Sequence, residues 1–392
     1  MHLIEAYSSN TRLKIDKPEI YLKYFPIPYE RFITFQTSSA MPAKNYGYFQ
    51  EVLDLISNKL KEANIKVLQL GAKDEPKLGG VLDLLGKTTI NQSAYIISKA
   101  ALHVGIDSCL THFASAFNTP LVSIYSVSPP SICGPFWGEK AKQICLEPPF
   151  TDRKYSFNPN ENPSVSNLIY PEIVANSILK LLGLEGQVNI STVYIGKMYN
   201  SPSIETIPDA VINPNFINGV LNIRGDQLFN ENNIYAQLSL CKCAVVIDRP
   251  LRIDVLKQLK PNLSLLALKI DNFPNLISYL KEVKKAAIQY SLITDIQSDE
   301  ELNKYKIDLY EYGLIIKQDK ITKNEVEFSG KLDDNIEVKS KSMTLSNGKV
   351  YLSLAHWKAQ RPCENINNVT EKVIDSTDFW SNYERYWFYK RK

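Results

Sequence analysis

The chain has 392 residues, 44% hydrophobic and 22% charged, which is the composition of an ordinary globular protein large enough for two domains. Its net charge of +3 is too small to favour nucleic-acid binding. The sequence has neither the run of about 18 apolar residues of a membrane-spanning helix nor an apolar stretch after Met1 typical of a signal peptide, so we expect a cytoplasmic protein.

Strands and helices alternate in the first half of the chain. Short apolar strands are predicted at 31–37, 65–71, 101–106 and 120–126, and helices at 46–63, 89–98, 111–117 and 170–182. This alternation predicts a parallel sheet with right-handed crossovers. We place the first α/β domain at 1–185, with a long surface loop at 147–168.

The second half, 190–392, is predicted to form another, less regular α/β domain. Strands are expected at 191–196, 221–225, 241–248, 263–270 and 286–294, with a helix at 275–285. The chain ends in an aromatic-rich segment, 378–392. As a helix, this segment would place its aromatic residues on one face, which favours docking onto a domain core over contact with sugars or single-stranded nucleic acid.

Cysteine and histidine patterns argue against a metal site. The six cysteines include no C-x-x-C pair, and the only close pair is Cys241 and Cys243. The four histidines include no doublet at helical spacing. We therefore predict reduced thiols and no bound metal.

The loop after the predicted strand 101–106 is the main candidate site. A parallel sheet binds ligands at the carboxyl ends of its strands, and Asp107, Ser108 and His112 follow such an end. The free N–H groups at the start of the next helix would suit a phosphate or diphosphate. The alternative is that Ser108 only caps the helix and His112 fills a polar gap beneath it.

A second loop follows the predicted strand 31–37 and is rich in hydroxyl groups. It contains Thr37 and Ser38 and leads to Lys44, whose ammonium could act as a point charge on a nucleotide phosphate. A solvated surface lysine is the alternative.

Together these segments resemble the nucleotide-sugar-binding domain of glycosyltransferase family nine, the lipopolysaccharide heptosyltransferase family. The resemblance covers about residues 1–185 and keeps the family's spacing throughout 86–135. Cys109 and Ser126 stand where the family has glycine. The matching positions are Gly86, Lys87, Thr88, Thr89, Ala94, Ala100, Val104, Gly105, Asp107, Ser108, His112, Ala114, Ala116, Pro120, Val122, Tyr125 and Pro130.

The resemblance implies a GT-B-like fold of two Rossmann-like domains, here with the donor-type domain first. It implies that Asp107, Ser108 and His112 line the diphosphate–sugar end of a donor pocket and that Lys44 contacts phosphate. Thr88 and Thr89 would lie near the base or ribose. The implied reaction transfers a sugar from a nucleotide-diphosphate sugar without metal or further cofactor.

The second domain would then hold the acceptor. Asp226 follows the predicted strand 221–225 and is our first candidate, and Asp248, at the end of the predicted strand 241–248, is the second. A carboxylate in that position could remove a proton from a hydroxyl acceptor. Glu205 and Asp209 are weaker candidates. The alternative for all four is an ordinary ion pair with a neighbouring arginine.

Three functions stay open at this point. The chain is a complete glycosyltransferase, a non-catalytic nucleotide or glycan binding protein, or one subunit of a split enzyme whose base lies on a partner chain. The acceptor is not identified by the sequence, and a saccharide is favoured over nucleic acid.

Overall fold

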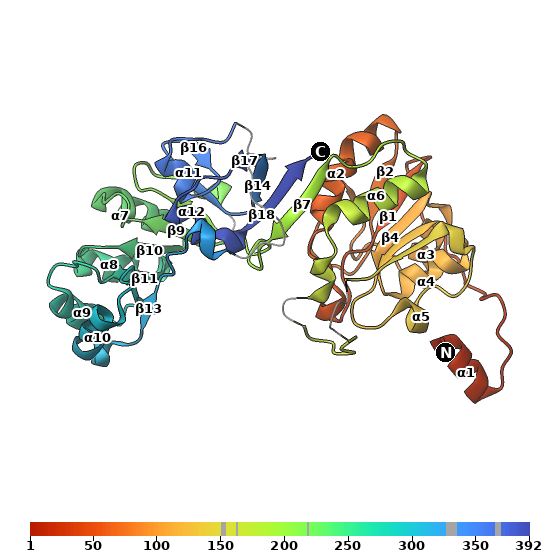
Figure 1. Ribbon diagram of the computed structural model, residues 1–392, viewed down its shortest axis with the longest axis horizontal. Helices are drawn as coiled ribbons and strands as arrows, with labels where there is room; N and C mark the ends of the chain where they lie inside the picture. The colour runs from red at the N-terminus through yellow and green to blue at the C-terminus, as the bar shows by residue number, and fades with distance from the viewer. Residues whose placement is uncertain (150–153, 162–163, 218, 327–334, 365–369) are drawn as a thin grey trace. The chain divides into compact units, whose positions relative to one another are not determined.

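The computed structural model describes residues 1–149, 154–161, 164–217, 219–326, 335–364 and 370–392. It divides into two compact units, Met1–Ile190 and Ser191–Lys392, each described here by itself (Figure 1). The predicted loop at 147–168 lies partly outside the described residues.

A six-stranded parallel sheet forms the centre of the first unit, with the strand order β3-β2-β1-β4-β5-β6. This is the order of the Rossmann fold, in which the direction of winding reverses between β1 and β4. Ligands of such sheets bind at the carboxyl ends of the strands beside that reversal. The strands are β1 (Phe32–Phe35), β2 (Lys66–Gln69), β3 (Leu82–Asp83), β4 (Leu102–Ile106), β5 (Leu121–Ile124) and β6 (Gln143–Leu146).

Helices cover both faces of this sheet, as right-handed crossovers on either side of a reversal require. Helix α2 (Phe49–Glu62) packs beside α6 (Pro171–Leu182), and α3 (Ile90–Lys99) packs beside α4 (Cys109–Ala116) (Figure 1). Each of the helices and strands predicted for the first half is therefore confirmed. Two further helices are α1 (Leu3–Thr11), which buries none of its side chains, and α5 (Pro130–Cys133).

The second unit contains an eight-stranded sheet with the order β13-β12-β11-β10-β9-β8-β15-β16. The strand pairs in this sheet are parallel except for β15 with β16, so the predicted α/β class is confirmed in both units. From β8 to β13 each strand lies next to the preceding one, without the reversal of the first sheet. The strands are β8 (Ile204–Thr206), β9 (Leu221–Arg224), β10 (Cys243–Ile247), β11 (Leu263–Lys269), β12 (Tyr290–Thr294), β13 (Ile315–Lys317), β15 (Met343–Ser346) and β16 (Lys349–Tyr351).

Winding in one direction leaves this sheet with one helix-covered face. Helices α7 (Glu231–Leu240), α8 (Ile253–Leu259) and α9 (Leu276–Lys285) share one apolar core with the strands, and α10 (Asp299–Asp308) follows β12. Along β9, Leu221 and Ile223 belong to that core, whereas Asn222 and Arg224 alternate with them and are only half-buried. Since side chains alternate across a strand, Asn222 and Arg224 point to the opposite, polar face.

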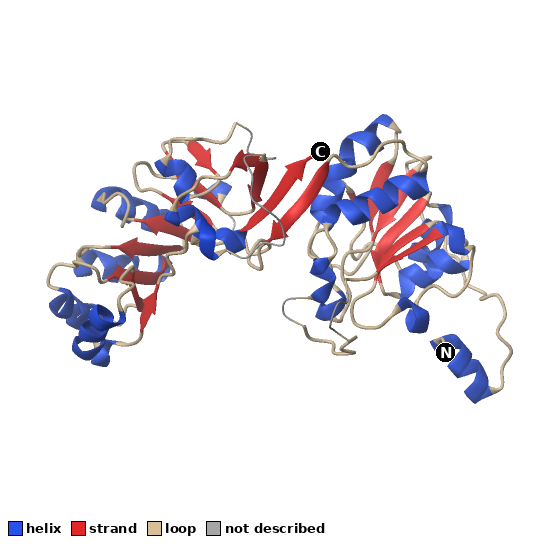
Figure 2. Ribbon diagram, in the orientation of Figure 1, coloured by secondary structure: helices blue, strands red, loops and turns tan. Residues whose placement is uncertain are grey.

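A separate four-stranded sheet, β17-β14-β18-β7, completes the second unit (Figure 2). The predicted strand at 191–196 is β7 of this sheet and does not join the parallel one. The sheet packs with α11 (Leu354–Lys358) and α12 (Thr377–Trp380). Its strands are β7 (Ile190–Ile195), β14 (Ile336–Ser340), β17 (Thr370–Lys372) and β18 (Tyr386–Arg391).

The prediction of one helix for the aromatic tail is wrong, because Tyr386–Arg391 forms strand β18 in the interior of this sheet. Aromatic residues fit a pleated, buried surface well, which favours the strand. Phe379, Trp380 and Phe388 are each at most 1% exposed, so the predicted docking onto a domain core is confirmed.

Replacing Gly196 with alanine is expected to destabilise the second unit by about 1–3 kcal/mol, the usual cost of overpacking. A Cβ at this position would lie 2.2 Å from the carbonyl oxygen of Glu384, and a backbone atom cannot move aside as a side chain can. The midpoint of urea denaturation measures the loss. Gly79→Ala is the matched control, since its Cβ would meet nothing nearer than 3.6 Å, and an equal loss in both variants would contradict the prediction.

Candidate functional site

The loops that leave β1 and β4 meet at the reversal of the first sheet. The Lys44 Nζ lies 2.6 Å from the Asp107 Oδ2, and the side chains of the two residues are 21% and 10% exposed. Lys44 lies in the loop after β1, and Asp107 directly follows β4. The structure therefore brings two of the predicted binding residues into one ion pair at the place where a Rossmann-type sheet binds its ligands.

Gln36 joins the two loops and was not among the predicted site residues. Its amide nitrogen donates to the Ser38 carbonyl at 3.2 Å, and its amide oxygen accepts a hydrogen bond from the Ser108 hydroxyl. The Thr37 hydroxyl is buried and accepts from the Gln69 amide at 3.1 Å. A position directly after a buried strand was the one signal that could have pointed to Gln36.

Ser108 stands at the N-cap position of α4 but makes no capping hydrogen bond with its side chain. The alternative prediction, in which the Ser108 side chain only caps the helix, is therefore wrong. Beside this helix end lies the thiol of Cys109, whose pKa is raised by burial and lowered in part by the N–H groups of Cys109 and Leu110. Backbone donors and the positive end of the helix dipole thus face the same region as Lys44 and Asp107.

His112 and Cys133 adjoin the ion pair. Burial lowers the pKa of His112; the charge of Asp107 opposes this shift, whereas His2 and Lys44 add to it. The Cys133 thiol lies 3.6 Å from the Asp107 Oδ2 and donates to the Ser128 hydroxyl at 3.2 Å. Burial raises the pKa of this thiol, so both groups are neutral neighbours of the Asp107 carboxylate at pH 7. Sequence reasoning gave no sign of Cys133.

Thr88 and Thr89 have local partners at the start of α3. The Thr88 hydroxyl lies 2.9 Å from the Ser93 hydroxyl. Thr89 is the N-cap of α3 and forms a capping box with Gln92. Among the described residues, no hydrogen bond or ion pair joins either threonine to Lys44 or Asp107, so their predicted place near a base or ribose stays a prediction.

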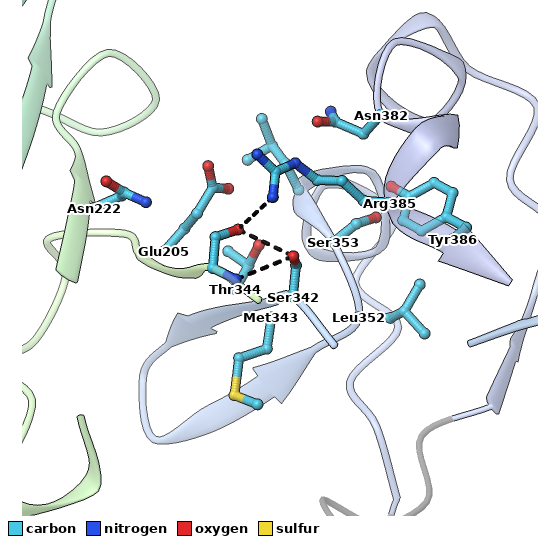
Figure 3. A pocket seen from close by; sticks show the side chains of 12 residues that line it. Glu205, Asn222, Ser342, Met343, Thr344, Leu352, Ser353, Asn382, Arg385 and Tyr386 are labelled. Carbon is cyan, nitrogen blue, oxygen red and sulfur yellow. Dashed lines mark hydrogen bonds between the residues drawn. The ribbon is translucent and has the colours of Figure 1, made fainter. Parts of the chain in front are cut away.

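The second unit holds a polar cavity of about 120 Å³ on the polar face of its parallel sheet (Figure 3). Glu205, one of the weaker candidates for an acceptor base, lines it together with Asn222 and Arg385. The other weaker candidate, Asp209, accepts hydrogen bonds from the Ser346 hydroxyl and from the Asn347 backbone at 3.0 Å. Asp209 therefore stabilises the turn at Ser346 and Asn347.

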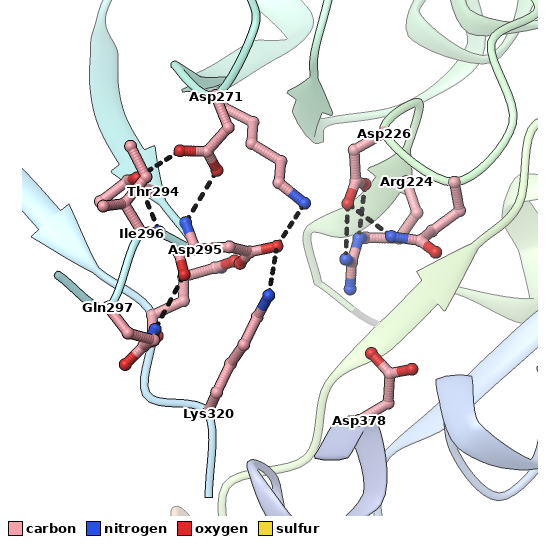
Figure 4. A network of polar contacts seen from close by, with 12 residues as sticks. Arg224, Asp226, Asp271, Thr294, Asp295, Ile296, Gln297, Lys320 and Asp378 are labelled. Atoms are coloured by element: carbon pink, nitrogen blue, oxygen red, sulfur yellow. Dashed lines mark hydrogen bonds and ion pairs between the residues drawn. The ribbon is translucent and has the colours of Figure 1, made fainter. Parts of the chain in front are cut away.

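Asp226 is almost fully buried and belongs to a charged network (Figure 4). Two hydrogen bonds of 2.8 Å join its carboxylate to the Arg224 guanidinium, and Gln227 donates a third of 2.7 Å. Burial raises the pKa of Asp226, but the hydrogen bonds and charge of Arg224 outweigh burial and the pKa lies below its ordinary value. This geometry is that of an ion pair, the alternative weighed from the sequence.

Asp248 is more accessible than Asp226, with 28% of its side chain exposed, and it pairs with the adjacent Arg249. It borders an open groove that also contains Lys269 and Asp295, which are 2.6 Å apart. The roles of Asp226 and Asp248 as acceptor bases stay predictions.

Within the described part of the chain, no three His, Cys, Asp or Glu side chains are grouped closely enough to hold a metal ion. None of the described helices combines the length and apolar character needed to cross a bilayer.

Solved structures similar to this chain include three bacterial proteins. ADP-heptose lipopolysaccharide heptosyltransferase II of E. coli is 20% identical with a TM-score of 0.31, and the match covers 45% of this chain and 50% of that one. A family 9 glycosyl transferase of Veillonella parvula is 20% identical with a TM-score of 0.32, covering 39% and 46%. E. coli heptosyltransferase WaaC with ADP is 16% identical with a TM-score of 0.32, covering 45% and 54%. The chain thus spans about half the length of these proteins.

No curated protein matches the chain. The model of glycosyltransferase family 9 (heptosyltransferase) matches residues 8–158, and for this part of the chain it confirms the family resemblance inferred from the sequence.

Proposed function

We propose that this chain is a glycosyltransferase that uses a nucleotide-diphosphate sugar as its donor. The observation that carries the proposal is the Lys44–Asp107 ion pair beside the start of α4, at the reversal of a Rossmann-type sheet. Sugar transfer releases a nucleoside diphosphate, whose negative charge grows as the glycosidic bond breaks. The Lys44 ammonium and the helix end supply fixed positive charge where that leaving group would form, so we propose a reaction without metal.

Lys44 and Asp107 have separate tasks in this proposal. An ammonium has three donors, so Lys44 keeps two for phosphate oxygens while it remains paired with Asp107. The Asp107 Oδ2 is occupied by Lys44 and Cys133, which leaves Oδ1 for a hydroxyl of the donor sugar. His112, whose lowered pKa keeps it neutral, adds a hydrogen-bonding group without a further charge. For the second unit by itself, Asp226 and Asp248 stay the proposed acceptor bases, and Asp248 is the more exposed of the two.

Lys44→Ala is expected to weaken the binding of a nucleoside diphosphate at least about tenfold, because a hydrogen bond to a charged group contributes about 1.5–3 kcal/mol. The measurement is the thermal shift of the protein against ADP, UDP, GDP, CDP and their sugars. Lys61→Ala, which removes an exposed lysine of α2, is the control and should bind as the wild type does. The double variant Lys44→Ala/Asp107→Ala removes both charges and separates lost binding from lost stability.

The outcomes distinguish the three functions left open by the sequence. If no nucleotide or nucleotide sugar shifts the wild type, or if Lys44→Ala binds unchanged, the donor site is refuted. Binding with slow release of nucleoside diphosphate in the absence of acceptor supports the enzyme. Binding without any turnover supports the non-catalytic alternative, and turnover that appears only with a copurifying chain supports the split enzyme.

A further inference from the structure

The cavity of the second unit lies where the parallel sheet meets the segments around Leu352 and Arg385 (Figure 3). Its volume of about 120 Å³ is well below the roughly 300–1,000 Å³ of pockets that enclose a nucleotide-sized or drug-sized ligand. It therefore suits a ligand of about one ring.

One row of side chains across three strands forms a wall of the cavity. Thr344 of β15, Glu205 of β8 and Asn222 of β9 are paired in register, so they project from the same face at the spacing of neighbouring strands, about 4.8 Å. The row presents a hydroxyl, a carboxylate and an amide. Neither Thr344 nor Asn222 forms a side-chain hydrogen bond with any residue that the structure describes. Thr344 is only 1% exposed, whereas Asn222 is half-buried, so its amide is available to a ligand.

Arg224 fixes the position of the Glu205 carboxylate in this row. The Arg224 Nη1 donates to the Glu205 Oε1 at 3.3 Å, and Arg224 is itself fixed by its two bonds to Asp226. The second carboxylate oxygen of Glu205 remains for the cavity. Arg224 is thus a positioning residue, since it acts through Glu205.

Donors face this row from the other side of the cavity. The Arg385 Nη1 donates to the Ser201 carbonyl at 3.1 Å and to the Ser203 hydroxyl at 3.4 Å. The guanidinium Nε and Nη2 form no hydrogen bond with the residues that the structure describes. Asn382 donates its amide N–H to the main-chain carbonyl of Asp378 at 3.0 Å, so its amide oxygen is left as an acceptor. The cavity therefore offers donors and acceptors in similar measure.

The charges around the cavity cancel. Of the residues that line it, Glu205 supplies one carboxylate and Arg385 one guanidinium. A ligand with a net charge would leave one of these groups uncompensated, whereas a neutral ligand with several hydroxyl groups satisfies carboxylate, amide and guanidinium at once. Leu352 and Leu354 add a small apolar surface of the kind that the carbon face of a ring covers.

We propose that this cavity binds one neutral sugar residue of a glycan, with Glu205, Asn222 and Arg385 as its hydrogen-bonding groups. The binding site stands on the second unit alone. Only its assignment as the place where the acceptor saccharide is held rests on the proposed transferase function.

The test is a titration of the full chain with neutral methyl glycosides of glucose, galactose, mannose and N-acetylglucosamine, followed by ligand-observed NMR and calorimetry. We expect at least one glycoside to bind in the millimolar range and Asn222→Ala to weaken it about tenfold, the effect of one lost hydrogen bond. Glu205→Gln keeps the shape and removes the charge, and it should weaken binding as well. Asn303→Ala, which removes an exposed amide of α10, is the matched control and should have no effect.

Three results would contradict the proposed sugar site. The proposal is overturned if no glycoside binds, if neither Asn222→Ala nor Glu205→Gln weakens binding, or if amino acids or inorganic phosphate bind in place of neutral sugars. If Glu205→Gln fails to fold, Asn222→Ala decides alone, because Asn222 lies outside the ion-pair network. Lys44→Ala should leave glycoside binding unchanged, so loss of nucleotide binding and loss of sugar binding identify failures of two different proposals.

Discussion

Replacing Arg224 with methionine is expected to lower the free energy of unfolding of the second unit by about 3–5 kcal/mol, the cost of removing one partner of a buried ion pair. The Asp226 side chain is only 2% exposed and depends on Arg224 for two of its hydrogen bonds. Without the guanidinium, Asp226 must stay charged in a desolvated place or take up a proton. Glu205 loses its support at the same time.

The measurement is urea denaturation followed by tryptophan fluorescence. Three of the four tryptophans lie in the second unit, and Trp137 is the exception, so a Trp137→Phe background makes the signal report on that unit. The double variant Arg224→Met/Asp226→Leu is the control and should recover most of the stability, because apolar residues of similar volume replace such pairs at little cost. A single variant as stable as the wild type, or a double variant no better than the single one, would contradict this account.

The first unit was largely predictable because its signals are local. The three central strands, β1, β4 and β5, are short runs of consecutively buried residues, and the long helix α2 carries an apolar stripe. The loop residues Lys44 and Asp107 could be proposed for the same reason, since both follow predicted strands. The two residues are 63 positions apart, and their direct contact could not be predicted. A parallel sheet only indicates that the loops after its strands lie at the same edge.

The second unit was harder to predict because its cavity is built from distant segments. Glu205, Thr344 and Arg385 are far apart in the sequence, and no periodicity connects a strand with a partner more than a hundred residues away. The aromatic C-terminal segment, 378–392, shows a second reason why the prediction failed. Phe379, Tyr383 and Trp387 have helical spacing, whereas Tyr386–Arg391 is short and almost wholly apolar at its start, a pattern that fits a buried strand equally well.

Acid is expected to destabilise the first unit through His103. This side chain of β4 is fully buried; its Nδ1 lies 2.9 Å from the Thr34 hydroxyl, and its Nε2 has no partner among the described residues. Burial lowers the pKa of His103 from 6.5 to about 3. Between these values the unfolded chain binds a proton at His103 that the folded chain does not, so the contribution of His103 to stability is constant above about pH 6.5 and falls as the pH decreases toward 3.

The expected loss is about 1.4 kcal/mol for each pH unit, or about 4–5 kcal/mol over the whole range. Hydrogen exchange of the β4 and β5 amides, corrected for intrinsic rates, measures it between pH 7 and 4.5. His103→Asn should lower stability at pH 7 and flatten this dependence. An unchanged slope would show that another group titrates.

A second variant separates burial from hydrogen bonding as the cause. Thr34→Val removes the partner of Nδ1 but keeps His103 enclosed by the same strands, so the pH dependence should persist at a lower absolute stability. The ring occupies space that only a glycine leaves open at position 105, because a Cβ there would come within 2.9 Å of Nε2. If Thr34→Val abolished the slope, the hydrogen bond rather than desolvation would control the protonation of His103.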